Sequence, residues 1–228
     1  MDKYLEGLLN YIKNYENKKV DTLFSEFHIS SKAKSKNFML SQALISNYEG
    51  REIWKAKFEK YKINLKTIQL KENGKPKEAM SFAPINYQKI VTETWENSEF
   101  NNYLSNSFLF FIFKIKDKQN IFVQAFIWNI PKEDLNGEIK LVWEDTKKKI
   151  SEGTIIKTIE NKKVIMWFLT EKVTNICHVR PHGSNGSDVA KLPVKDKKTG
   201  YEYASKQSFW FNHSYLEKIV ENHLEEHL

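Results

Sequence analysis

Asn64 and Lys66 interrupt an otherwise apolar stretch that predicts a β-strand. Residues 63–70 (INLKTIQL) are mostly β-branched or apolar, and Asn73-Gly74 supplies the turn that ends the strand. Side chains two residues apart lie on one face of a strand, so Asn64 and Lys66 are expected side by side. In metal-dependent DNA cleavage, a strand presents an acid and a lysine at this spacing, and a second acid comes from just upstream.

The acid that such chemistry needs is missing from this stretch. Carboxylates hold the divalent cation that activates water, whereas Asn64 can coordinate only through a neutral carbonyl. A magnesium site built on Asn64 would therefore be weak. Lys66 remains, and a lysine at this position is suited to orient a water molecule or to contact a phosphate.

Residues 63–82 (INLKTIQLKENGKPKEAMSF) resemble the core of the MutH-type nucleases, in which a Glu-x-Lys-Thr-Ile strand precedes a Gly-Lys-Pro turn. This family includes the mismatch-repair endonuclease and GATC-cutting type II restriction enzymes. By the spacing of the family, the two catalytic acids fall on Lys57 and Asn64. The family places a third acid on the helix expected at residues 31–47, which contains no Asp or Glu. The resemblance therefore implies a nuclease site that has lost its acids and keeps Lys66.

A second stretch resembles the same family near the other end of the chain. Residues 178–185 (HVRPHGSN) are similar to its Arg-Pro loop, and residues 206–212 (KQSFWFN) to the aromatic segment that approaches the major groove. Gly, Ser and Asn let a loop backbone approach phosphates, and an arginine can bond guanine O6 and N7 together. The DNA-binding residues that the resemblance implies are Arg180, His182, Ser184, Asn185, Lys206, Gln207 and Trp210.

Three features of the sequence allow more than one interpretation. His178 and His182 suggest a zinc pair, although their segment is predicted as a strand entering a loop and their spacing suits a helix. The lysines at 147–149 end a predicted helix, where they either cap it in solvent or contact DNA. Residues 188–203 are a polar surface excursion, either an arm that orders on DNA or a solvated loop.

Composition indicates one α/β domain over residues 1–228. The chain has 228 residues, of which 40% are hydrophobic, and carries a net charge of +7 with a pI near 9.1. The charge suits a nucleic-acid partner, although lysine enrichment can also follow from the base composition of the gene. Cys177 is the single cysteine, so an intramolecular disulfide is impossible. The longest apolar run, residues 108–113, is too short to span a membrane, and a cytoplasmic location is expected.

Hydrophobic periodicity predicts an alternation of helices and strands, and the family resemblance implies a restriction-endonuclease-like (MutH-like) mixed central sheet flanked by helices. The last residues of the chain are predicted to be a helix, and the aromatic segment at 209–211 is expected to alternate, with Trp210 facing opposite to Phe209 and Phe211. The expected helices are residues 2–15, 23–27, 31–47, 132–151 and 215–224. The expected strands are residues 63–70, 107–116, 121–130, 164–169 and 175–179.

The resemblance implies an effector domain rather than an enzyme. Such a domain would bind GATC in double-stranded DNA and activate a catalytic nuclease domain of the same parent chain, as in a type IIE-like restriction endonuclease. It would need no metal itself, while the parent nuclease would use Mg²⁺, and a homodimer on DNA is compatible with it. The alternative is an active Mg²⁺-dependent endonuclease with relocated acids at Glu59, Glu72 or Glu78. A dimerisation platform without DNA contact is the third hypothesis.

Overall fold

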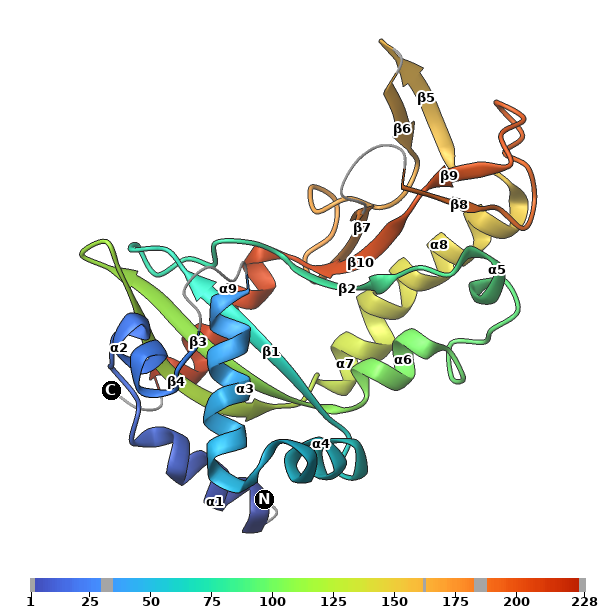
Figure 1. Ribbon diagram of the computed structural model, residues 1–228. Helices are drawn as coiled ribbons and strands as arrows, with labels where there is room; N and C mark the ends of the chain where they lie inside the picture. The colour runs from blue at the N-terminus through green and yellow to red at the C-terminus, as the bar shows by residue number, and fades with distance from the viewer. Residues whose placement is uncertain (1–2, 30–34, 162, 183–187, 226–228) are drawn as a thin grey trace. The chain divides into compact units, whose positions relative to one another are not determined.

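A computed structural model describes residues 3–29, 35–161, 163–182 and 188–225 (Figure 1). The chain divides into two compact units, each built from separate segments. The first comprises Met1–Glu78, Ser105–Asn129 and Val220–Leu228, and the second comprises Ala79–Leu104 and Ile130–Ile219. The mixed α/β class predicted from the sequence is confirmed, whereas the single domain over residues 1–228 stays a prediction.

The first unit is a three-stranded sheet with four helices on one side (Figure 1). The strands lie in the order β1-β3-β4, with β1 parallel to β3 and β3 antiparallel to β4. A parallel pair needs a long connection, which residues 71–106 provide. The helices are α1 (Lys3–Lys13), α2 (Val20–Glu26), α3 (Lys36–Glu49) and α4 (Arg51–Lys60). The strands are β1 (Ile63–Leu70), β3 (Ser107–Lys116) and β4 (Gln119–Trp128).

The apolar run in β3 explains why this strand occupies the centre of its sheet. Residues 108–113 are all fully buried, so both faces of β3 are covered. Alternate residues of β3, among them Phe111 and Phe113, join a core with side chains of α1, α3 and α4. On β4, the ring of Phe126 stacks on His223 at 4.0 Å between ring centroids. A strand buried on both faces has a continuous rather than an alternating apolar pattern.

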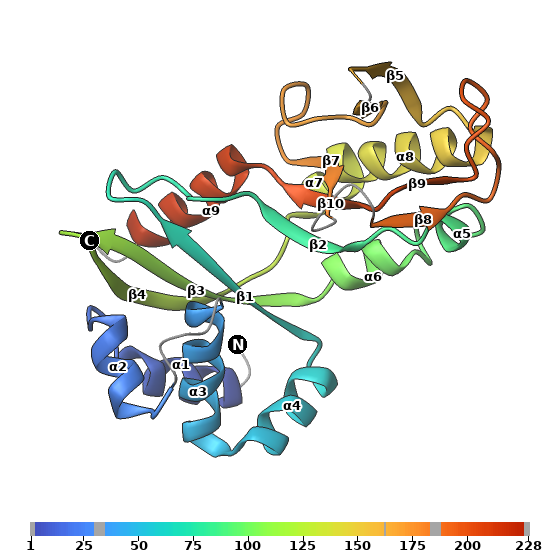
Figure 2. The ribbon, with the colours of Figure 1, turned by 45° about the horizontal axis from the view of Figure 1, so that its top comes forward.

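The second unit is organised by a separate antiparallel sheet in the order β2-β10-β7. Its central strand β10 carries the aromatic segment, and two short hairpins, β5-β6 and β8-β9, belong to the same unit (Figure 2). The strands are β2 (Met80–Pro84), β5 (Ile156–Glu160), β6 (Lys163–Met166), β7 (Cys177–Pro181), β8 (Val189–Lys191), β9 (Tyr203–Ser205) and β10 (Gln207–Phe211). The helices are α5 (Tyr87–Ile90), α6 (Glu99–Leu104), α7 (Lys132–Asp134), the π-helix η1 (Leu135–Ile139), α8 (Lys140–Glu152) and α9 (His213–Glu225), which the boundary at Val220 divides.

The structure corrects two of the predicted elements. Residues 164–169 do not form a core strand: β6 ends at Met166 and pairs only with β5, and the side chain of Trp167 is 53% exposed. The helix predicted at 31–47 is α3, which begins at Lys36 and continues to Glu49. It therefore ends on an acid that the predicted boundary excluded. Part of the predicted helix, residues 31–34, lies outside the described residues.

The described part of the chain contains no helix that is both long enough and apolar enough to cross a membrane.

Gly153 and Gly200 form a matched pair for testing how tightly the second unit is packed. Both have positive φ, at 65° and 73°, which costs a residue with a Cβ about 1–2 kcal/mol. A Cβ on Gly153 would lie 2.5 Å from the backbone oxygen of Lys195, whereas a Cβ on Gly200 would meet nothing within 4 Å. We expect Gly153→Ala to lower the free energy of unfolding by about 3 kcal/mol and Gly200→Ala by about 1 kcal/mol. Urea unfolding followed by circular dichroism measures both, and equal losses would contradict the close approach at Gly153.

Candidate functional site

Asn64 and Lys66 lie on the same face of β1, as the strand prediction requires. Their partners in the parallel register on β3 are Phe108 and Phe110, which are fully buried. Both polar side chains are half-buried. Removal of Lys66 from water disfavours its charged form and lowers its pKa to about 8. The face therefore carries a partly desolvated amine beside an amide.

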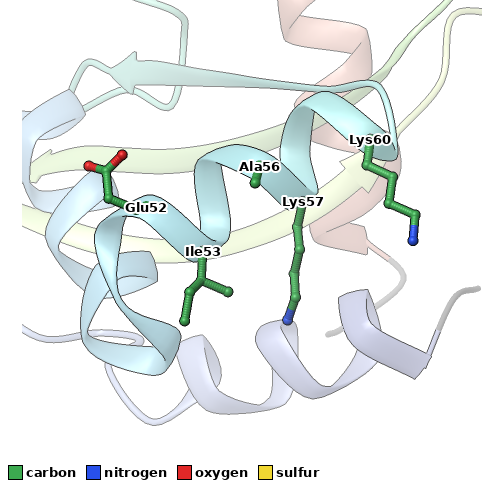
Figure 3. A pocket seen from close by; sticks show the side chains of 5 residues that line it. All are labelled: Glu52, Ile53, Ala56, Lys57 and Lys60. Atoms are coloured by element: carbon green, nitrogen blue, oxygen red, sulfur yellow. The ribbon is translucent and has the colours of Figure 1, made fainter.

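Lys57 is directed to a different set of partners. Its ammonium forms an ion pair with Glu49, the last residue of α3, and lies 4.1 Å from the centroid of the Tyr4 ring. In Figure 3 its side chain extends from α4 toward α1 and away from the β1 ribbon. The Tyr4 hydroxyl also donates to Glu49. Burial raises the pKa of Tyr4, and the hydrogen bond to the Glu49 carboxylate raises it further. Lys57 therefore fastens α4 to α1 and α3.

Figure 3 also shows a shallow hollow of about 430 Å³ along α4, which Glu52, Ile53, Ala56, Lys57 and Lys60 line. The exposed lining of this hollow is largely apolar, with one carboxylate and two amines at its margin.

The residues on β1 do not fit a magnesium site. Mg²⁺ prefers carboxylate and water oxygens in octahedral geometry, whereas Asn64 supplies one neutral oxygen and Lys66 a positive charge. The acids proposed as replacements, Glu59, Glu72 and Glu78, are exposed, and Glu72 accepts a hydrogen bond from the backbone of Asp117 at 3.2 Å. Within the described ranges, no group of three or more His, Cys, Asp or Glu side chains could hold a metal ion. That this domain uses no metal stays a prediction.

The second unit brings together three of the residues predicted to bind DNA. The guanidinium of Arg180, on β7, lies 4.2 Å from the centroid of the Trp210 ring on β10. The ring of His182 lies 5.8 Å from the same indole, and the side chains of Arg180 and His182 are exposed. An arginine stacked on an aromatic face is held in place without losing its hydrogen-bond donors. This cluster is a basic and aromatic surface.

The alternation of side chains along β10 separates core residues from surface residues. Phe209 stacks on Phe100 at 4.2 Å, and Phe211 contacts the Phe82 ring edge to face at 4.8 Å, so both belong to the core. Trp210 lies on the opposite face and is only half-buried. The predicted orientation of the three aromatics is confirmed.

Lys206 holds both ends of the loop that carries Ser184 and Asn185. The backbone nitrogen of His182 donates to the Lys206 oxygen at 3.1 Å, and the Lys206 nitrogen donates to the Asp188 oxygen at 3.0 Å. The Lys206 ammonium also forms an ion pair with Asp188 at 2.6 Å. Ser184 and Asn185 lie outside the described residues, so their DNA contacts stay predictions. Asp188 was not predicted from the sequence, because a single acid in a polar segment has no distinctive pattern.

Gln207 is placed differently from its neighbours. Its side chain is 1% exposed and lies on the face of Phe209 and Phe211, and its Nε2 donates to Ser205 Oγ at 2.9 Å. A DNA contact by Gln207 stays a prediction, and it would require this side chain to leave the interior. Ser208, which pairs with Arg180 in the register, was not predicted from the sequence. Three buried atoms of this strand have no hydrogen-bond partner among the described residues, namely Gln207 Oε1, Ser208 Oγ and Trp210 Nε1.

His178 supports the strand rather than the surface. Its Nδ1 lies 2.6 Å from Asn212 Oδ1, and Asn212 Nδ2 donates to the Thr174 oxygen at 2.8 Å. Because this donation fixes the Asn212 amide, Oδ1 is the acceptor and the His178 proton is assigned to Nδ1. Burial lowers the pKa of His178, which favours the neutral ring. His178 therefore links β7 to the residue that follows β10.

The two remaining polar segments are also engaged within the protein. Lys149 pairs with Asp145 at 2.7 Å, and Lys147 donates to the backbone oxygen of Glu93. These contacts favour a solvated helix end over a DNA contact at 147–149. Residues 188–203 include the paired strands β8 and β9, and their turn is fixed by Asp196, whose Oδ1 accepts from the Thr199 nitrogen at 3.0 Å.

Comparison with known proteins identifies relatives of the chain. Residues 48–140 match the family described as "DNA mismatch repair enzyme MutH", a range that includes Lys57, Asn64 and Lys66. The chain is 33% identical over 242 aligned residues to the type II restriction enzyme Sau3AI of Staphylococcus aureus. This alignment covers 91% of the chain and 49% of the relative, so the chain spans about half the length of that enzyme.

The desolvated amine of Lys66 predicts a stability gain when the charge is removed. The unfolded chain keeps this proton up to about pH 10.5 and the folded chain only up to about pH 8, so charged Lys66 destabilises the fold below pH 8. We expect Lys66→Met to stabilise the protein by on the order of 2 kcal/mol at pH 7, a value reduced by partial exposure to solvent. The gain should decrease between about pH 8 and pH 10.5 in urea titrations. Lys71→Met, at an exposed lysine beyond the strand, is the control, and a gain independent of pH would contradict the assignment.

Proposed function

We propose that the chain is a double-stranded DNA-binding domain of the MutH type, which recognises GATC without cleaving it. The proposal rests on one observation, namely that the chain has a basic and aromatic surface but lacks acids on β1. Arg180, His182 and Trp210 form a basic and aromatic surface, while the strand that would carry the nuclease chemistry holds Asn64 and Lys66. A protein that has a DNA-contacting surface but no acids on the strand of the nuclease site is expected to bind DNA and leave it intact.

The chemistry of the Arg180 surface supports recognition of bases in the major groove. A guanidinium presents two parallel donors to guanine O6 and N7, and Arg180 is exposed near the end of β7 with its guanidinium stacked on an indole. The His182 ring lies near the same indole, and Lys206 is joined to His182 through a backbone hydrogen bond. Both side chains suit phosphate oxygens, which fix the register of a protein on a duplex. GATC as the sequence follows from the family and from no single residue here.

The contents of β1 support the loss of cleavage. Without carboxylates, a cation that polarises the phosphate and activates water has no charged ligand on this strand. The pKa of about 8 leaves Lys66 mostly charged at neutral pH, so it suits a phosphate contact. Activity from relocated acids is the outcome that the experiment below is designed to detect.

We further propose that both units together represent a restriction-endonuclease-like fold. The mixed β1-β3-β4 sheet with its covering helices provides the nuclease core, and the β2-β10-β7 sheet provides the DNA-reading strands. A central sheet of three strands is small for this class. The likeness rests on the family and on the order of the motifs along the chain.

The role in a larger enzyme is that of an allosteric effector. The matched relative is about twice as long as the aligned region, which leaves room for a catalytic nuclease domain in a parent chain that would use Mg²⁺. GATC bound at this domain would shift that partner toward a cleaving state, in the manner of a type IIE restriction endonuclease in the cytoplasm. A homodimer on DNA is compatible with this role.

The proposal predicts specific retention of DNA with intact strands. In gel-shift titrations with Ca²⁺ and then Mg²⁺, we expect a GATC duplex to bind more tightly than a scrambled duplex. Denaturing gels of the Mg²⁺ samples should show no nicks. Cleavage in Mg²⁺ would overturn the effector role and direct attention to acids near Lys66.

Arg180→Ala is expected to weaken binding to the GATC duplex by about 10- to 100-fold, because one bidentate base contact contributes roughly 1–3 kcal/mol. Arg51→Ala is the matched control, since Arg51 is the only other arginine and lies exposed on α4. It removes the same charge outside the proposed surface and should change the affinity by less than about twofold. Equal effects of the two substitutions would mean that only overall charge matters.

A further inference from the structure

Asp188 forms an ion pair with Lys206, one of the residues proposed to contact DNA. Asp188 Oδ1 lies 2.6 Å from Lys206 Nζ, and the two backbones are joined by the bond from the Lys206 nitrogen to the Asp188 oxygen. A carboxylate at this distance takes the place that a phosphate oxygen would take in a complex. In the free protein, the charge of Lys206 is therefore already neutralised by Asp188.

We infer that Asp188 is an internal competitor for DNA phosphate and sets the affinity of this surface. The inference rests on the proposed DNA-binding function. A duplex can gain the Lys206 contact only by displacing Asp188, and the displaced carboxylate then faces an approaching polyanion. Both effects act on any duplex, whatever its sequence. Asp188 thus lowers the affinity for all DNA, while Arg180 determines which sequence is preferred.

The backbone geometry explains why this pair is held in place. Lys206 stands between β9 and β10, and its backbone bonds to His182 and Asp188 hold it at the base of the loop. The side chains of Lys206 and Asp188 are 39% and 35% exposed, so solvent screens their attraction only in part. The pair of Lys195 and Glu202, at 2.8 Å, belongs to the same β8-β9 region but is 67% and 49% exposed. It offers a matched ion pair beyond the proposed surface.

The test compares Asp188→Asn with Glu202→Gln, which changes the net charge by the same amount in the same hairpin region. Asparagine keeps the size and the backbone bond of Asp188, so the loop base should persist. We expect Asp188→Asn to bind GATC and scrambled duplexes about two- to fivefold more tightly at about 0.1 M salt, with their ratio unchanged. The plot of log affinity against log salt concentration should become steeper by about 0.9, the value for one additional phosphate contact.

Lys206→Ala makes the comparison specific to this pair. If Asp188 acts through Lys206, Asp188→Asn in the Lys206→Ala background should lose most of its gain in affinity and its change of salt slope. Glu202→Gln should leave affinity and slope within experimental error of the wild type. A gain that persists without Lys206, or an equal gain from Glu202→Gln, would show a bulk charge effect and overturn the inference.

The outcomes separate this inference from the proposed function. If the wild type prefers GATC and Asp188→Asn binds no more tightly, the competitor role is wrong and DNA recognition stands. If the wild type binds no duplex, the proposed function is wrong. Elution from a heparin column then decides the competitor role, because Asp188→Asn should need more salt than Glu202→Gln if Asp188 masks Lys206, and the same salt if it does not.

Discussion

The alternation of side chains along β-strands determines where the candidate functional residues of this chain lie. On β1, Ile63 and Leu65 pack against the helices while Asn64 and Lys66 take the other face. The parallel register with β3 fixes this arrangement, because a slip of one residue would bury both polar side chains in the helical core.

The same constraint acts on β10, where it makes three consecutive aromatics useful. Phe209 and Phe211 hold the strand to the interior, and their burial leaves Trp210 on the opposite face with Arg180 above its ring. The core thus provides the rigid support that a stacked arginine needs. It also explains why Gln207 is buried, since it shares the parity of the two phenylalanines.

Local patterns in the sequence predicted the elements that depend on hydrophobic periodicity. The strands β1, β3 and β4 and the orientation of Trp210 follow from apolar runs and a period of two. What the sequence could not show are side-chain contacts between different elements, such as Lys57 with Glu49 and Lys206 with Asp188. Neither acid has a distinctive local pattern, so each pairing emerges only when helices and loops pack. The β6 error has the same origin, because an apolar run alone does not reveal whether a strand joins the central sheet.

The proposed loss of cleavage and the proposed DNA binding are physically compatible, because they depend on different residues of different segments. Coordination of a metal requires negative charge on β1, whereas recognition requires Arg180 and Trp210 in register on β7 and β10. A domain that binds DNA without cleaving it can still regulate a partner domain, provided that the bound DNA favours one conformational state of the partner over another. The free energy of this regulation can be no larger than the difference between the affinities of the two states for DNA. If Asp188 competes with phosphate as inferred, it weakens binding to every duplex equally, so the proposed preference for one sequence depends on Arg180 alone.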